Sequence, residues 1–253
     1  QGDESQRIGG PGGGSFVVDI NNNPLIIAGG GGCFFGASVE IWNTVITGNT
    51  VGWESSESML GGGLYLDTSD VVAFNTTISD NVTTSAAFGS SGLGQGGGVG
   101  MYNSSLTLDE DCLITNNESD LGGGLYLNGT NEMAGGRVND NDAVSGGGGF
   151  YLNGTLTVTD GTLIDDNWSP FGGGAYLQGS VLIGDATPSI TDNEADEGGG
   201  IYMWDSEVSG IALTYNSAPS GGGLVTVDNG TLHSGVTISD NTADYGGGIL
   251  AHV

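Results

Sequence analysis

The sequence predicts an all-β protein that folds as a right-handed parallel β-helix of about nine rungs. Three observations lead to this prediction: glycine provides 52 of the 253 residues, it clusters in triplets, and apolar residues alternate after each triplet. Alternation is the period of a strand, and short strands in a repeat of about 25 residues are typical of a solenoid. The later triplets recur every 23 to 26 residues, starting at residues 96, 122, 147, 172, 198, 221 and 246.

The elements follow one another in a constant order. Residues 1–11 are expected to be an N-terminal tail, and residues 12–253 a single β-helix domain. Each repeat has an aliphatic residue, an asparagine three positions later, four further residues and the triplet, which is expected at a bend because glycine tolerates backbone angles that other residues avoid. Residues 50–60 and 82–95 lengthen two early repeats. We expect these two insertions at the same corner of neighbouring coils.

The asparagine of the repeat is expected to point inward and to form a structural ladder. Equivalent positions stack in a solenoid, so the amides can bond from one coil to the next. The predicted ladder consists of Asn81, Asn117, Asn141, Asn167, Asn193, Asn216 and Asn241.

An aspartate precedes this asparagine in several repeats. Asp140, Asp166 and Asp192 would stand outward on three consecutive coils about 5 Å apart, where like charges repel. Calcium would relieve this repulsion, because it accepts carboxylate oxygens in flexible geometry. The alternative is a row of solvated acids at turns with diffuse counterions. No other cofactor is expected.

A tyrosine stands between two inward apolar residues in five repeats. It is therefore expected to face outward and to form an aromatic stripe, suited to sugar faces or to packing against another rod. The alternative is cross-strand pairing within the sheet. The stripe consists of Tyr65, Tyr126, Tyr151, Tyr176 and Tyr202.

Eight Asn-x-Ser/Thr sequons occur, three of them in the inward ladder, where a glycan would be blocked. The accessible candidates begin with the two that follow the outward tyrosine positions; in order they are Asn128, Asn153, Asn75, Asn103 and Asn229.

The strongly negative net charge argues against two classes of binding partner. The chain has 30 acidic residues, two arginines and no lysine, with a net charge of −28. This argues against nucleic acid and anionic membranes, because both require clustered cations. No apolar run of 18 residues is present, so we expect no membrane insertion. Cys33 and Cys112 fall on different parts of the coil and are expected to be separate and reduced.

An enzyme is the main alternative class, because β-helices include polysaccharide lyases and glycoside hydrolases. A lyase acting on polyuronate needs cationic groups, and this chain has few. A hydrolase needs two nearby carboxylates, for which Asp165 and Asp166 are the best pair. No catalytic residue is assigned, and the protein is not expected to be an enzyme.

The asparagine-x4-Gly-Gly-Gly-aliphatic pattern over residues 46–250 resembles the repeats of the polymorphic outer membrane protein family, whose passengers carry Gly-Gly-Ala-Ile/Leu and Phe-x-x-Asn motifs. The resemblance implies a right-handed β-helix that is secreted or displayed on a cell surface, as an adhesin or stalk. This chain has Gly-Gly-Gly in place of Gly-Gly-Ala and an aliphatic residue in place of phenylalanine.

Together these observations favour an extracellular structural or adhesive protein, either a surface stalk or a self-assembling filament. The first residue, Gln1, suggests a processed chain or a fragment. Head-to-tail association of identical chains is expected because the last coil of one copy could pair with the first coil of the next. A carbohydrate or cell-surface ligand is a second candidate partner, and a secreted carbohydrate-active enzyme remains the alternative function.

Overall fold

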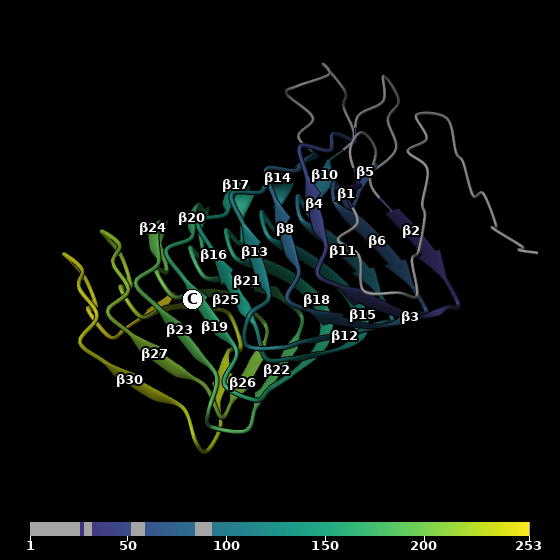
Figure 1. The fold of residues 1–253 in the computed structure, drawn as a ribbon. Helices are drawn as coiled ribbons and strands as arrows, with labels where there is room; N and C mark the ends of the chain where they lie inside the picture. The colour runs from purple at the N-terminus through teal and green to yellow at the C-terminus, as the bar shows by residue number, and fades with distance from the viewer. Residues whose placement is uncertain (1–25, 28–31, 52–58, 84–92, 253) are drawn as a thin grey trace, which may run out of the picture.

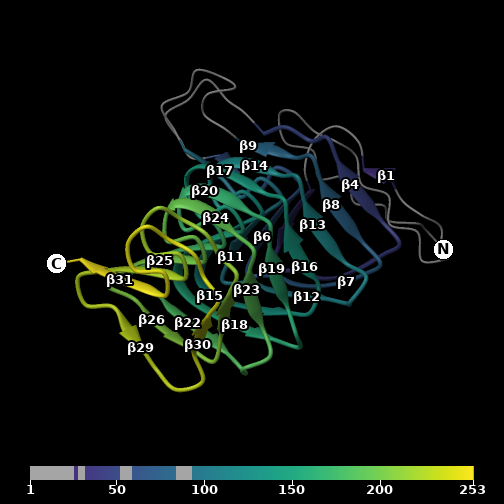
Figure 2. The ribbon, with the colours of Figure 1, turned by 90° about the vertical axis from the view of Figure 1, so that its left-hand side faces the viewer.

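The computed structural model describes residues 26–27, 32–51, 59–83 and 93–252. Over these residues the chain winds as a parallel β-solenoid, with no helix in the described part (Figure 1). The strands succeed one another along the stack from purple to yellow, so that β4 and β31 lie toward opposite ends (Figure 2). The predicted tail, and the start of the domain up to residue 25, lie outside the described residues.

The first sheet contains the aliphatic position of each repeat. Its neighbouring strands pair in parallel; Ile114 is in register with Val138, for example. In stacking order the strands are β1 (Ile26–Ile27), β4 (Val45–Thr47), β8 (Thr77–Ser79), β13 (Leu113–Thr115), β16 (Arg137–Asn139), β19 (Leu163–Asp165), β23 (Ser189–Thr191), β27 (Ala212–Thr214) and β30 (Thr237–Ser239).

The second sheet precedes the glycine triplets. Its strands are β5 (Met59–Leu60), β9 (Val82–Thr83), β10 (Gly94–Gln95), β14 (Glu118–Leu121), β17 (Asp142–Gly146), β20 (Trp168–Phe171) and β24 (Glu194–Glu197). Later coils continue this face only as isolated bridges, such as Glu194 with Ser217.

The third sheet follows the triplets. Its main strands are β2 (Gly32–Phe35), β6 (Leu64–Asp67), β11 (Val99–Tyr102), β15 (Leu125–Ala134), β18 (Phe150–Thr159), β21 (Ala175–Gln178), β25 (Ile201–Trp204), β28 (Leu224–Val227) and β31 (Ile249–His252). Beside them run β3 (Ser38–Trp42), β7 (Asp70–Phe74), β12 (Ser105–Leu108), β22 (Val181–Gly184), β26 (Glu207–Ser209) and β29 (Thr231–Leu232).

The predicted parallel solenoid is confirmed, but about nine rungs was slightly too many. The first and third sheets each stack nine strands, whereas the structure makes about six complete turns. Six strands, from β5 to β24, form the continuous path of the second sheet. The physical reason is that pairing on this face weakens to isolated bridges in the last coils, so those coils are not closed by three strands.

The glycine triplets are needed for two different reasons. The first glycine turns the chain in the left-handed region, as at Gly122 with φ of 65°. A Cβ there would lie 2.0 Å from the carbonyl oxygen of Leu125. The third, such as Gly124, has no positive φ, but its Cβ would lie 2.7 Å from the carbonyl oxygen of Gly149 on the next coil. Close stacking of the coils therefore excludes side chains at this corner.

The interior is filled by aliphatic side chains from the first and third sheets. Ile114, Val138 and Leu125 are fully buried, as alternation predicts. Each coil thus buries its apolar face against the coils on either side, and this burial drives folding.

The flanks of the two predicted insertions stack on each other. Thr50 forms a bridge with Val82, and Leu60 is in register with Gln95. Both insertions therefore leave and rejoin the same face on neighbouring coils, as expected. Residues 52–58 and 84–92 themselves lie outside the described part of the chain.

The two thiols are free, as the sequence predicted. Cys33 is exposed and Cys112 is buried. The Sγ of Cys112 accepts a hydrogen bond from the amide of Thr76 and donates to the carbonyl of Ala73. Burial, aided by the nearby Asp109 carboxylate, raises the pKa of Cys112 to about 11 from its ordinary value of 9.0.

This pKa predicts a loss of stability in alkali. Above pH 9.0 the unfolded chain releases the Cys112 proton while the folded chain keeps it, so the free energy of unfolding falls as the pH rises from 9.0 to about 11. The measurement is denaturant unfolding of the wild type and Cys112→Ala at pH 8, 10 and 11, because the difference between them isolates this thiol from the tyrosines. A difference that stays constant over this range would contradict the prediction.

Candidate functional site

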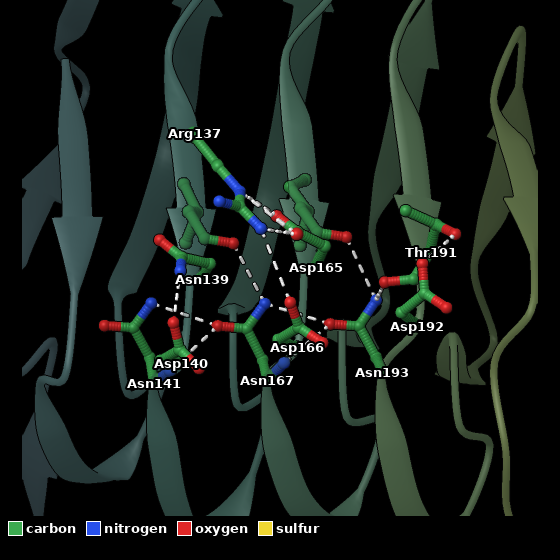
Figure 3. A network of polar contacts seen from close by, with 12 residues as sticks. Arg137, Asn139, Asp140, Asn141, Asp165, Asp166, Asn167, Thr191, Asp192 and Asn193 are labelled. Carbon is green, nitrogen blue, oxygen red and sulfur yellow. Dashed lines mark hydrogen bonds and ion pairs between the residues drawn. The ribbon is translucent and has the colours of Figure 1, made fainter. Parts of the chain in front are cut away.

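Three columns of stacked side chains carry the candidate functional residues. They are the inward asparagines, the aspartates beside them and the tyrosines after the glycine corner. Figure 3 shows the first two columns on the coils around β16, β19 and β23.

The asparagine ladder is confirmed over its whole predicted length. Each amide Nδ2 donates to the Oδ1 of the next asparagine, at 2.9 to 3.0 Å from Asn81 through to Asn241. Each Oδ1 also accepts from the backbone N–H of the preceding asparagine, as Asn193 does from Asn167 at 3.0 Å. The structure adds Asn49 at the start, bonded to Asn81 at 2.8 Å. The ladder is a structural element, because its amides bond to one another and to the backbone.

The aspartate column is exposed, as expected. The cause is the backbone conformation of these residues and not the alternation of a strand. Asp140, Asp166 and Asp192 have φ of 52° to 56°, so they occupy a left-handed corner between two faces of the coil. Aspartate and asparagine tolerate this conformation better than most residues. The carboxylates of Asp140 and Asp192 also accept hydrogen bonds from the preceding side chains, Asn139 and Thr191. The column is thus partly explained by turn chemistry.

The pairing of Arg137 with Asp165 was not foreseen from the sequence. β16 and β19 are neighbours, and the Arg137 Nε lies 2.8 Å from Oδ1 of Asp165, while the guanidinium also forms an ion pair with that carboxylate. The guanidinium reaches Asp166 as well, at 3.4 Å (Figure 3). The hydrogen bond to Asp165 raises the pKa of Arg137.

This ion pair involves residues of two predicted sites, the calcium site and the hydrolase carboxylate pair. Asp165 is buried and held by Arg137, whereas Asp166 is exposed. Partial desolvation, with the neighbouring Asp165, raises the pKa of Asp166. No group of three or more side chains within the described residues is arranged to hold a metal ion. Calcium at Asp140, Asp166 and Asp192 stays a prediction, as does the hydrolase pair.

The tyrosine column forms a continuous stack in its later part. The rings of Tyr126, Tyr151, Tyr176 and Tyr202 follow one another with centroids 5.1 to 5.4 Å apart and interplanar angles of 7° to 17°. The expectation of an outward stripe needs correction for its centre, since Tyr126 and Tyr151 are only 8% and 7% exposed.

The burial of these rings follows from the corner that they occupy. A Cβ added to Gly146, at the end of the second sheet, would lie 3.0 Å from a ring carbon of Tyr176. Phe171 of the same sheet packs edge-on against Tyr202, with centroids 5.2 Å apart. Tyr176 and Tyr202 therefore lie against the second sheet, and Tyr126 and Tyr151 are covered by stacking with the neighbouring rings. Burial raises the pKa of Tyr151 and Tyr176 above the ordinary value.

The stripe is interrupted once. Gly100 is in register with Tyr65 on one side and Tyr126 on the other, so a glycine occupies a tyrosine position. A cavity of about 300 Å³ lies here and includes both tyrosines in its lining. Alignment of the sequence repeats already places Gly100 at a tyrosine position, but only the strand register shows that Tyr65 and Tyr126 lie on either side of it.

The predicted glycosylation residues differ in their surroundings. Asn153 and Asn229 are exposed, and Asn128 is half-buried. Asn75 and Asn103 occupy left-handed corners, and the Oδ1 of Asn103 accepts from the backbone N–H of Thr130. The three sequons of the ladder are buried, as expected. Glycosylation itself stays a prediction.

Comparison with known proteins adds no relative. No family model, no curated protein and no solved structure matches the chain. The resemblance to the polymorphic outer membrane protein repeats therefore rests on the quoted motifs, while the solenoid fold rests on the structure. In the described residues no helix is long and apolar enough to cross a bilayer.

Proposed function

We propose that the protein is an extracellular structural or adhesive solenoid, akin to the passenger repeats of polymorphic outer membrane proteins, that binds a glycan surface through its aromatic stripe. The observation that carries the proposal is the stack of four tyrosine rings along one corner. Tyr176 and Tyr202 are half-buried, so each ring keeps an exposed margin that can contact the apolar C–H groups of a sugar. A repeated spacing of about 5 Å suits an extended ligand rather than a single small molecule.

The rest of the molecule supports a mechanical role for the solenoid. Seven side-chain hydrogen bonds join the eight asparagines of the ladder from one coil to the next. The close backbone contacts at the glycine corners leave little room for the coils to shift relative to one another. Such an arrangement holds the tyrosines in a fixed row without requiring them to order on binding. Head-to-tail association of copies, which would extend this row, is part of the proposal.

The proposed adhesion predicts that the stripe governs retention on polysaccharides. The double variant Tyr176→Leu/Tyr202→Leu is expected to bind immobilised neutral polysaccharides at least about tenfold more weakly than the wild type, because it removes two adjoining, partly exposed rings. Retention is measured by sedimentation with insoluble glucans, mannans and galactans. Trp168→Leu is the matched control, since this exposed tryptophan lies on β20 outside the stripe.

Two outcomes would contradict the proposal. One is equal retention of the double variant and the wild type, with unchanged circular dichroism. The other is release of soluble sugars from the polysaccharide that is abolished by Asp165→Asn or Asp166→Asn, which would establish the carbohydrate-active enzyme instead.

A further inference from the structure

The interruption of the aromatic stripe at Gly100 is accompanied by a cavity that Tyr65 and Tyr126 both line. Two coil steps of about 4.8 Å separate the Tyr65 and Tyr126 positions, about 10 Å in all. The space directly beside Gly100 is filled, because a Cβ there would lie 2.9 Å from the Gly61 nitrogen and 3.4 Å from Cδ2 of Tyr65. A ligand would therefore lie farther out, against the side chains that line the cavity. The cavity of about 300 Å³ is at the lower end of the range for ligand sites.

Polar side chains border the same cavity on one side. Asp67, Tyr102 and Asn128 stand in register on three consecutive strands, β6, β11 and β15, two residues after the tyrosine column. All three line the cavity, and Gln95 of the second sheet lines it from the other side. These groups comprise a carboxylate acceptor, a phenol and two amides that both donate and accept. Vicinal hydroxyl groups, each a donor and an acceptor, match this set.

The negative charge around the cavity favours a neutral sugar over an acidic one. Asp67 borders the cavity, and the chain has 30 acidic residues against two arginines. A uronate or a sulfated sugar would meet like charge without a compensating cation. A neutral sugar loses no charge solvation on entry and can place its apolar C–H faces against the two rings.

We propose that the cavity lined by Tyr65 and Tyr126 binds one neutral hexopyranose unit, which contacts these two rings and is hydrogen-bonded by Asp67, Asn128, Tyr102 and Gln95. The inference deepens the proposed adhesion, on which it rests, by adding a single-residue subsite to the extended stripe.

The test is an NMR titration of the ¹⁵N-labelled chain, produced in bacteria so that Asn128 carries no glycan. The probes are the methyl glycosides of glucose, galactose and mannose, at up to about 50 mM, since single-sugar affinities in the millimolar range correspond to about −4 kcal/mol. At least one probe is expected to shift the amide signals of Gly100 and Asp67 in a saturable manner. Asn128→Ala, which removes a polar group from the lining of the cavity, is expected to weaken this binding about tenfold.

A second variant and a control keep the test independent of folding. Tyr102 is 44% exposed, so Tyr102→Ala should fold and still weaken binding about tenfold. Trp168→Leu changes an exposed ring on β20, outside the stripe, and should leave the affinity for the methyl glycoside within about twofold of the wild type.

Each outcome has a defined meaning. Saturable shifts that are lost in both cavity variants support the subsite. The absence of shifts with all three sugars, or shifts that survive both variants, would overturn it. Saturable shifts at Gly100 with N-acetyltryptophanamide and none with the sugars would also overturn it, in favour of an aromatic peptide ligand. Retention of the wild type on polysaccharide decides the adhesive function separately, because that function can hold while the subsite fails.

Discussion

Asn167→Ala is expected to lower the free energy of unfolding by about 4 kcal/mol, the largest effect of any single substitution considered for this protein. The Asn167 Oδ1 accepts from the backbone and side-chain nitrogens of Asn141, both at 3.0 Å. Its Nδ2 donates to the carbonyl of Val138 at 3.0 Å and to Oδ1 of Asn193 at 2.9 Å. The residue is 1% exposed, so water cannot replace these four bonds without entering the core.

The measurement is the shift of the denaturant midpoint, monitored by circular dichroism at constant pH. Asp166→Asn is the matched control, because it alters the adjacent residue while keeping a side chain that tolerates the left-handed corner, with φ of 54°. Its effect should stay within about 1 kcal/mol, since Asp166 is exposed and its contact with Arg137 is 3.4 Å long. Equal midpoints for Asn167→Ala and the wild type would refute an energetic role for the ladder.

Gly173→Ala is expected to lower the free energy of unfolding by about 3 kcal/mol, through overpacking between coils. The Cβ would lie 2.4 Å from the carbonyl oxygen of Glu194 and 2.7 Å from that of Gly199. Both atoms belong to the backbone of the next coil, so neither can rotate away. Relief requires the coils to separate locally, which weakens the hydrogen bonds of the adjoining strands.

Gly179→Ala is the control that separates close packing from backbone strain. Gly179 has φ of 57°, but nothing lies within 4 Å of the position of its Cβ. Alanine there should cost about 1 kcal/mol, from the left-handed conformation alone. Both variants are compared in the same denaturant series. A larger loss for Gly179→Ala than for Gly173→Ala would show that coil spacing does not explain the triplets.

The interior of the coil could be predicted from the sequence because it depends on local pattern. The inward position of Asn141 and Ile114 follows from their place in a repeat, and stacking repeats that position on each coil. The left-handed corner at Asp140 has an equally local cause, in the turn chemistry of aspartate. The exposure of Asp140 was predicted correctly, but the positive φ that causes this exposure was not predicted.

The candidate sites could be predicted less well because they depend on contacts between coils. Tyr126 and Tyr151 were expected outside, yet they are buried and stack on the neighbouring rings. The sequence did not indicate a partner for Arg137, yet the register of β16 and β19 places it against Asp165. These contacts join residues 25 or more positions apart, and no short motif encodes them.

By itself, the sequence determined the coil: the period of glycine and asparagine dictates where each turn bends, and alternation dictates which side chains fill it. Only the tertiary structure decided which residues of different coils meet. The physical reason is that backbone hydrogen bonds set the register between strands, and register alone brings Gly100 between Tyr65 and Tyr126 and opens the cavity there.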